Sequence, residues 1–355
     1  MPTSGTMRAW RVHALGDPLE VLRLDQVPAL EPSDQHVVLE VLASAVNFAD
    51  TLLCRGTYQE KPELPFTPGL EVCGRVLAAP PGAAVGPGER VIALPALPHG
   101  GLAEQAVARP TDVFSVPDTM DDVTAAALPV TYQTGWFGLY HRARLQEGET
   151  VLVHAAAGGV GSAAVQLAIA AGARVIATAG GEEKLAFAKG LGADVAIDYR
   201  EVDFAQVVLD ETGGAGVDVC FDGVGGDVMM QSLRCLGRGG RHLMVGFASG
   251  IEAEEVPMVS GRALCFGNFD IVGVILAYRD RSIPASLQFE MPVPVPRFNS
   301  PPADQGEAVQ AHLLELLDAG VIRPVVGDRV AFEQLPEALE AMEARQMFGR
   351  VVVER

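Results

Sequence analysis

The stretch Val151-Leu-Val-His-Ala-Ala-Ala-Gly-Gly-Val-Gly-Ser-Ala-Ala-Val-Gln-Leu-Ala168 decides the fold of this chain. A short β-branched apolar run enters a glycine turn, and a run of small apolar residues leaves it with the character of a helix. A glycine–alanine corner and a second apolar run, residues 174–178, come next. The succession of strand, glycine turn, helix and strand predicts a βαβ unit whose helix N-terminus receives the pyrophosphate of a dinucleotide.

The glycine turn differs from the usual GxGxxG fingerprint, because Ala156 stands at its first position, ahead of Gly158 and Gly161. Gly158 and Gly159 let backbone amides approach the phosphates, and Gly161 lets the helix pack closely on its strand. Glycine turns also join strands and helices that bind nothing, but the strand–turn–helix context favours a nucleotide site. We therefore predict cofactor contacts at Gly158, Gly159 and Val160.

The end of the second predicted strand indicates which dinucleotide binds. Folds that prefer NAD place an Asp or Glu there, which accepts hydrogen bonds from the ribose 2′-hydroxyl. Here the strand ends in Thr178-Ala-Gly-Gly181, and Lys184 follows on the next predicted helix. An open corner at Gly180, with a cation and no carboxylate at the strand tip, suits a 2′-phosphate. Glu182 and Glu183 would repel a phosphate if they pointed inward, and Lys184 could instead pair with them, but the pattern favours NADPH over NADH.

The composition sets broad limits on function. The 355 residues suffice for two domains, and 49% hydrophobic with 20% charged residues is typical of globular proteins. A net charge of -19 argues against binding to nucleic acid or to an anionic membrane. No apolar segment follows the first residues, and the apolar stretch 271–278 is too short to cross a bilayer. Five scattered cysteines without a CxxC pair suggest neither disulfides nor a zinc knuckle, so we expect a cytoplasmic protein.

Two differently patterned regions follow one another along the chain. Up to about residue 124 the pattern is β-rich, with strand-like runs separated by Pro- and Gly-rich turns. Residues 151–268 alternate between strand-like and helix-like runs, which favours a parallel sheet. The proline-rich residues 284–302 suggest an extended surface loop, with a polyproline partner motif as the alternative.

Further motifs occur in order: Val46-Asn-Phe-Ala-Asp50, Arg55-Gly-Thr-Tyr58, Leu64-Pro-Phe-Thr-Pro-Gly-Leu-Glu71, the glycine turn, Ile197-Asp-Tyr-Arg200 and Phe348-Gly-Arg-Val-Val-Val353. With them the chain resembles, over essentially its whole length, the zinc-free quinone oxidoreductase branch of the medium-chain dehydrogenase/reductase superfamily. In the last motif the family more often has lysine after the glycine.

The resemblance implies an α/β architecture in which one domain interrupts another. A doubly wound parallel Rossmann sheet, residues 126–268, would be inserted into a GroES-like, β-rich catalytic domain formed by residues 1–125 and 269–355. It also implies a homodimer, because family members usually associate through the edge strands of their Rossmann sheets.

The resemblance also assigns candidate site residues. It places Asn47 and Thr134 by the nicotinamide, and Lys184 and Tyr199 around the adenosine 2′-phosphate, which agrees with the preference for NADPH. The loop beside the nicotinamide ribose is matched by Phe247 and Ser249.

The same resemblance points away from a metal. Zinc-dependent alcohol dehydrogenases of this superfamily have a cysteine where this chain has Asn47 and a histidine where it has Leu70. Glu71 remains, but one carboxylate cannot hold a metal that needs three protein ligands. Without a Lewis acid, alcohol oxidation is disfavoured. The expected reaction is hydride transfer from NADPH to a small-molecule quinone or α,β-unsaturated carbonyl.

Tyr58 is compatible with more than one kind of hydride acceptor. In quinone reductases the matching tyrosine lines the substrate cleft. In the related enoyl-thioester reductases it is thought to protonate carbon after hydride transfer, which a phenol can do at neutral pH. A buried tyrosine that only caps a loop is a further alternative. We therefore treat Asn47 and Tyr58 as candidate catalytic residues. The competing functions are an enoyl-thioester reductase and a non-catalytic nucleotide-binding protein.

Overall fold

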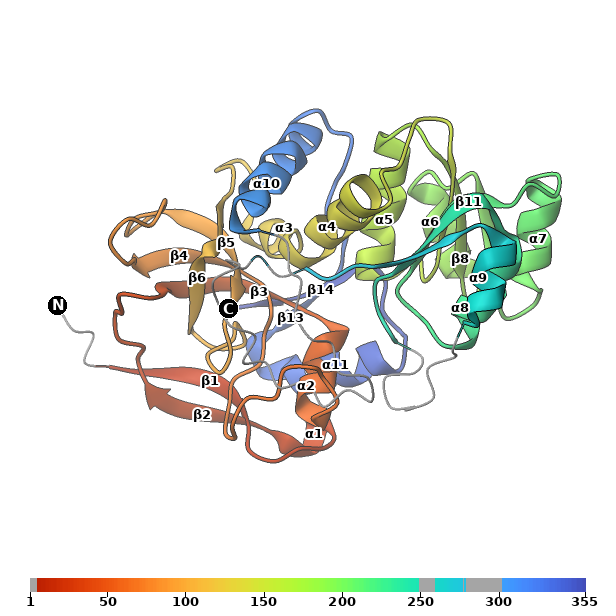
Figure 1. Cartoon of the computed structure of the whole chain (residues 1–355). Helices are drawn as coiled ribbons and strands as arrows, with labels where there is room; N and C mark the ends of the chain where they lie inside the picture. Colours follow the sequence, from red (N-terminus) through yellow and green to blue (C-terminus); the bar gives the residue numbers. More distant parts are fainter. Residues whose placement is uncertain (1–4, 249–258, 277, 279–301) are drawn as a thin grey trace. The chain divides into compact units, whose positions relative to one another are not determined.

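The computed structural model describes residues 5–248, 259–276, 278 and 302–355. The chain divides into two compact units. We call residues 1–130, 277–311 and 324–355 the barrel unit, and residues 131–276 and 312–323 the Rossmann unit. Each unit is therefore assembled from segments that lie far apart in the sequence (Figure 1).

The barrel unit is built on antiparallel strands. Strands β3, β4, β5 and β6 pair in sequence, and an additional β3–β6 pairing closes them into a small barrel. Strand β14 pairs with β3 on its other side, so the end of the chain completes a sheet begun near its start (Figure 1). The strands are β1 (Thr6–Val12), β2 (Leu22–Pro28), β3 (Val37–Val46), β4 (Val72–Ala78), β5 (Arg90–Pro95), β6 (Gln105–Ser115), β13 (Val326–Ala331) and β14 (Arg350–Glu354).

Apolar side chains fill the barrel unit in two clusters. One cluster lies among the barrel strands and includes Leu39, Val72 and Val91, all fully buried. A second packs the β1–β2 ribbon against Phe332 and the helices α2 and α11. Burying each such side chain stabilises the fold by roughly 1.5–3 kcal/mol. The helices of this unit are α1 (Pro18–Val21), α2 (Phe48–Arg55), α3 (Asp122–Ala126) and α11 (Leu335–Glu343).

The Rossmann unit contains the predicted parallel sheet, in the order β12-β11-β10-β7-β8-β9. The order reverses between β7 and β10, and dinucleotides bind at such a switch point. The elements are β7 (Thr150–Val153), α5 (Gly159–Ala170), β8 (Arg174–Ala179), α6 (Glu182–Gly190), β9 (Val195–Asp198), α7 (Phe204–Glu211), β10 (Val217–Asp222), α8 (Asp227–Ser232), β11 (Leu236–Met244), α9 (Gly261–Gly267) and β12 (Asp270–Gly273). This confirms the predicted fold class.

The domain boundaries differ from those predicted. Strand β12 hydrogen-bonds to β11, so the Rossmann sheet continues past residue 268. Residues 126–130 group with the barrel unit, and residues 312–323, inside or next to the long helix α10 (Ala303–Asp318), group with the Rossmann unit. A four-residue strand carries no sequence signal for which sheet it joins, which is why the boundary at 268/269 was wrong. Nearly all of the proline-rich stretch 284–302 lies outside the described residues.

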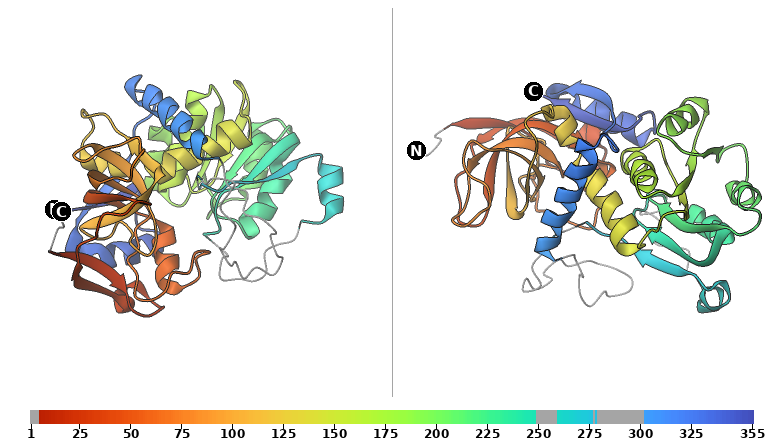
Figure 2. Two further views of the ribbon diagram at one scale, coloured as in Figure 1. Left: turned by 60° about the vertical axis from the view of Figure 1, so that its left-hand side comes forward. Right: turned by 90° about the horizontal axis from the view of Figure 1, so that it is seen from above.

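The outer edge of the Rossmann sheet is strongly exposed. Strand β12 is its last strand, and α9, which precedes it, has no buried residue and stands away from the rest of the unit (Figure 2). Phe266 on α9 is 82% exposed, and Ile271 on β12 is 36% exposed. In the described part of the chain, no helix combines the length and apolar character that crossing a membrane requires.

Candidate active site

The predicted phosphate loop lies between β7 and α5. Gly158 is the N-cap residue of α5, and among the described residues no side chain caps the helix there. The first amides of a helix have no acceptor within it, so those of residues 159–161 are available to a ligand. Ala155 adopts a positive φ of 49°, and its carbonyl accepts a 2.9 Å hydrogen bond from the amide of Gly158. The turn thereby holds the helix N-terminus at the carboxyl end of β7.

Gly161 is required by the tight packing of this turn. A Cβ atom at position 161 would lie 2.2 Å from the carbonyl oxygen of Ala155 and 2.8 Å from its carbonyl carbon. Both are backbone atoms of the phosphate loop. Any side chain at this position therefore displaces the loop, as the close helix–strand role of the third glycine predicts.

The predicted 2′-phosphate corner lies where β8 and β9 end. Gly180 and Gly181 follow β8, Lys184 is half-buried on α6, and Tyr199 follows β9 with 40% of its surface exposed. The guanidinium of Arg200 lies against Gly180, where a Cβ atom would be 2.5 Å from its Nε. The amide of Tyr199 donates to the carbonyl of Ala179 at 3.4 Å, so Arg200, which follows it, adds a second cation to the predicted corner.

Carboxylates at this corner are directed to backbone or solvent. Asp198 accepts hydrogen bonds from the amides of Gly181 at 2.9 Å and Arg200 at 3.0 Å. Glu182 and Glu183 are exposed in the first turn of α6. Arg200 is absent from the predicted site, because its contact with Gly180 depends on the pairing of β9 with β8, which the sequence does not show.

Two further nucleotide-site candidates, Phe247 and Thr134, lie elsewhere in the Rossmann unit. Phe247 follows β11, is 42% exposed and lies beside Gly225 in the loop after β10. Thr134, on α4 (Pro129–Trp136), is buried, and its neighbour Gly135 packs on Leu167 of α5. Ser249 lies outside the described residues.

A buried polar cluster supports the phosphate loop. His154, the first residue after β7, contacts the hydroxyls of Thr178 and Ser232 through its two ring nitrogens, at 2.9 and 2.7 Å. Burial lowers the pKa of His154 to about 4, against the opposing charge of Asp222. The ring is therefore neutral at physiological pH, and with both nitrogens engaged it is a structural residue.

In the barrel unit, Asn47 lies in a buried network of charges. Its Nδ2 donates to Glu71 Oε1 at 2.9 Å, and its Oδ1 accepts from Arg350 at 3.1 Å. Arg350 also contacts Glu71 Oε1, and Glu71 Oε2 accepts the amide of Val130 at 2.9 Å. Burial lowers the pKa of Arg350 to about 10, with the charge of Asp50 opposing, so the guanidinium is charged at neutral pH.

Asp50 fixes the backbone at Asn47. Its carboxylate accepts the amide of Asn47 at 2.8 Å and the amide of Gly69 at 3.0 Å, which caps α2 and ties it to the loop before Glu71. Burial raises the pKa of Asp50 to about 6, although both hydrogen bonds and the charge of Arg350 favour the ionised form. Its role at this position is structural.

Tyr58 lies a few residues beyond α2 and packs against the second apolar cluster of the barrel unit. Burial raises the pKa of its phenol above the usual range, and the charges of Glu60 and Asp50 add to the shift. The phenol therefore keeps its proton at neutral pH. It can donate a hydrogen bond or a proton, but it is a weak acid.

The positions that match the zinc ligands of alcohol dehydrogenases hold other residues in this chain. Asn47 and Leu70 are not metal ligands of the required kind, and both oxygens of Glu71 are already bonded. Within the described ranges, no three His, Cys, Asp or Glu side chains are grouped so that they could hold a metal ion.

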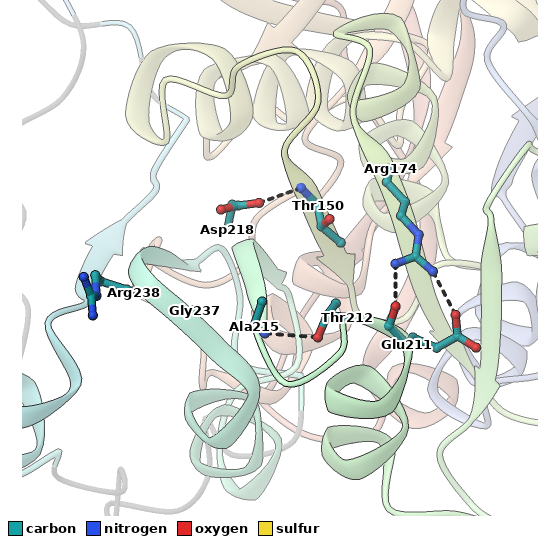
Figure 3. A pocket seen from close by; sticks show the side chains of 9 residues that line it. Thr150, Arg174, Glu211, Thr212, Ala215, Asp218, Gly237 and Arg238 are labelled. Carbon is teal, nitrogen blue, oxygen red and sulfur yellow. Dashed lines mark hydrogen bonds and ion pairs between the residues drawn. The ribbon is translucent and has the colours of Figure 1, made fainter.

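An open hollow of about 490 Å³ lies at the opposite end of the Rossmann sheet (Figure 3). Its lining includes the first residues of β7 and β8, Thr150 and Arg174, whereas the phosphate loop follows the carboxyl end of β7. Arg174 pairs with Glu211 at 2.8 Å, and Asp218 accepts the amide of Thr150 at 2.8 Å. These contacts tie β8 to α7 and β7 to β10, so the polar groups there serve the fold.

Comparison with known proteins relates both units to one family. Residues 33–118 match the alcohol dehydrogenase GroES-like domain, and residues 159–289 match a family described as zinc-binding dehydrogenase. The second match includes neither position 47 nor positions 70–71. A quinone oxidoreductase-like protein 2 homolog of Nematostella vectensis is 34% identical over 98% of this chain and 88% of its own length.

Two solved structures are similar over nearly the whole chain. A mycobacterial protein in complex with NADPH is 31% identical with a TM-score of 0.83, covering 98% of this chain and 100% of that one. The quinone oxidoreductase of Thermus thermophilus, also solved with NADPH, is 32% identical with a TM-score of 0.75 at the same coverage. The fold, the matched domains and these relatives show that the chain belongs to the quinone oxidoreductase branch of the medium-chain dehydrogenase/reductase family.

Proposed function

We propose that this chain is an NADPH-dependent oxidoreductase that passes a hydride to a quinone or α,β-unsaturated carbonyl without a metal ion. The observation that carries the proposal is the corner after β8, where Arg200 lies on Gly180 and Lys184 follows in the first turn of α6. Such a site suits a phosphate, and the carboxylate at the end of β9, Asp198, already accepts the amides of Gly181 and Arg200. Relatives solved with NADPH support the same cofactor.

The residues present fit this cofactor. The amides of residues 159–161 suit the pyrophosphate, because they lack helical acceptors and no side chain in the described part of the chain caps them. Lys184 and Arg200 would bind the 2′-phosphate, with Tyr199 beside them, and Phe247 would lie by the nicotinamide ribose together with Thr134 and Ser249. When bound, NADPH supplies the hydride.

The barrel unit would supply the group that stabilises the acceptor during hydride transfer. An acceptor that takes up a hydride gains negative charge, which a quinone or enone delocalises over its conjugated system. Asn47 would donate a hydrogen bond to the acceptor oxygen from its second Nδ2 hydrogen, which is held only weakly by the carbonyl of Ala45 at 3.4 Å. Because Asn47 and Leu70 replace metal ligands, this donor takes over part of the role of a Lewis acid.

The proposal is tested by NADPH oxidation with a panel of quinones, alkenals and enoyl-CoA esters, with and without a chelator. We expect turnover with quinones or alkenals, unchanged by the chelator. Turnover confined to enoyl-CoA would favour the enoyl-thioester reductase. Tight NADPH binding without turnover of any acceptor would favour a non-catalytic nucleotide-binding protein, and loss of activity restored by zinc would contradict a metal-free reaction.

Tyr58→Phe distinguishes the two enzymatic functions. A reduced quinone takes its protons from water, so the phenol is dispensable and kcat should change only a few-fold through altered packing. In an enoyl-thioester reductase the proton goes to carbon, and a positioned general acid contributes about 10²–10⁴ in rate. Steady-state kinetics with a quinone measures the difference. A loss of a hundredfold or more, with NADPH affinity intact, would assign Tyr58 to proton transfer.

We also propose that the chain forms a homodimer through β12. This strand is at the edge of the Rossmann sheet, and the adjoining Phe266 is 82% exposed, as expected of a surface covered by a second copy. Sedimentation velocity should show a dimer that Phe266→Asp weakens, whereas Val202→Asp, at another exposed position of this unit, leaves it intact. A monomeric wild-type protein at micromolar concentration would contradict the proposal.

A further inference from the structure

Three buried polar side chains meet at one end of the barrel-unit sheet. Arg350 directly precedes Val351, which pairs with Val46 of β3, and Asn47 directly follows Val46. Glu71 directly precedes β4, the other neighbour of β3. Antiparallel pairing therefore places all three residues at the same end of the sheet. Their exposed fractions are 5% for Arg350, 6% for Asn47 and 0% for Glu71.

The contacts among them fix the orientation of the Asn47 amide. A guanidinium can only donate hydrogen bonds, and an ionised carboxylate can only accept them. Arg350 faces Oδ1 and Glu71 faces Nδ2. A rotation of the amide by 180° would set donor against donor and oxygen against oxygen in a buried site, so only one orientation is compatible with both neighbours.

In this orientation Asn47 keeps one N–H that is only weakly engaged. Its Nδ2 carries two hydrogens, and Glu71 Oε1 accepts one of them at 2.9 Å. The other is directed to the carbonyl of Ala45 at 3.4 Å, beyond the usual range for such a bond. The guanidinium bonded to Oδ1 polarises the amide and makes that remaining N–H a better donor.

The charge of Arg350 has a second effect. Glu71 is fully buried, and alone it would oppose the negative charge that forms on a nearby acceptor during hydride transfer. Arg350 contacts the same Glu71 oxygen that accepts from Asn47, so the pair is neutral overall. The network thereby offers the substrate a hydrogen-bond donor whose carboxylate partner, Glu71, is balanced by a cation.

We propose that Arg350 is a positioning residue for the reaction, which holds the Asn47 amide in its donating orientation and neutralises Glu71. The inference rests on the proposed function, since it assumes that Asn47 contacts the hydride acceptor. It assigns to Arg350 an effect on kcat that is separate from cofactor binding and from folding.

The test compares Arg350→Met, Arg350→Lys and wild type in kcat, in KM for the quinone and in the Kd of NADPH. Arg350→Met removes the donor and the charge, and kcat should fall by about 10- to 100-fold, the range for one charge-assisted hydrogen bond. Arg350→Lys keeps a positive charge and hydrogen-bond donors at this position, and kcat should stay within about fivefold of wild type. The Kd of NADPH should change by less than about threefold in both variants.

Arg90→Met is the matched control. Arg90 is a largely buried arginine of the same unit that pairs with Asp122 at 2.7 Å, so its loss also removes a cation from a carboxylate. It should lower thermal stability and leave kcat unchanged. Should Arg350→Met fail to fold, Arg350→Gln replaces it, and kcat of this neutral variant should lie at least tenfold below that of Arg350→Lys.

Each of the other possible results would contradict a specific part of the proposal. Wild-type kcat in folded Arg350→Met, equal kcat in Arg350→Gln and Arg350→Lys, or an equal loss in Arg90→Met would each overturn the positioning role. A loss that appears only in the Kd of NADPH would make Arg350 a nucleotide contact instead. A wild-type protein that binds NADPH but reduces no acceptor would overturn the proposed function, and the inference with it.

Discussion

Gly161→Ala is expected to weaken NADPH binding by at least about 100-fold and to lower the Tm of the protein by roughly 6–12 °C. The added Cβ would lie 2.2 Å from the carbonyl oxygen of Ala155, and neither the loop nor the helix can give way by moving a flexible side chain. Strain of this kind costs about 3 kcal/mol. Relief by movement of the loop would displace the amides that receive the pyrophosphate. Thermal unfolding and fluorescence titration with NADPH measure the two effects.

Gly190→Ala is the control for this change. Gly190 ends α6 in the same unit, and a Cβ there would meet no atom of the described residues within 4 Å. Alanine in a helix is favoured over glycine by roughly 0.5–1 kcal/mol, so Tm should stay or rise slightly and NADPH affinity should not change. Wild-type affinity in Gly161→Ala would show that the loop tolerates a side chain and that its packing does not define the site.

The second large effect concerns cofactor selectivity. Lys184→Ala should weaken NADPH binding about tenfold or more and leave NADH almost unaffected, because a charge-assisted bond contributes roughly 1.5–3 kcal/mol. Arg200→Ala should have an effect of similar size, since its guanidinium lies on Gly180 at the same corner. The double variant should lose about 100-fold in affinity for NADPH and approach equal affinity for the two cofactors.

Lys189→Ala controls for the loss of a positive charge from α6. Lys189 is in the last turn of that helix and donates to the carbonyl of Asp194, directly before the amino end of β9, whereas the predicted 2′-phosphate corner follows the carboxyl ends of β8 and β9. Its removal should leave both dissociation constants unchanged. An equal loss for NADPH and NADH in Lys184→Ala, or a wild-type preference for NADH, would contradict the assignment of this corner to a 2′-phosphate.

The parts that sequence predicts well are those whose signals are local. The run from Val151 to Ala168 contains its own strand, turn and helix, and the structure shows all three. Strand β12 was assigned to the wrong domain, because its pairing with β11 depends on neighbours that four residues cannot specify.

The same distinction applies to the site. Gly158 and Gly180 are recognisable from the sequence because glycine between a strand and a helix indicates a tight turn or a close approach of the backbone to a ligand. Arg200 follows β9 and contacts Gly180, which follows the neighbouring strand β8. Predicting that contact requires knowledge of the strand order in the sheet. Arg350 differs from the lysine more frequent in the family, but its contact with Asn47 joins residues about 300 positions apart. A linear pattern carries no information on which buried charges will meet.

The distance between Glu71 and Arg350 also bears on how the protein is made. About 280 residues separate them, so at roughly 5–20 residues per second the ribosome adds Arg350 some 15–55 s after Glu71. Until then the strand β14 and its guanidinium are missing, and burying Glu71 beside Asn47 would isolate a carboxylate from both water and its counterion. The Rossmann unit between them is synthesised in the meantime and can fold first. Closure of the barrel-unit sheet by the last strand is thus the event that permits the charged centre of the site to leave solvent.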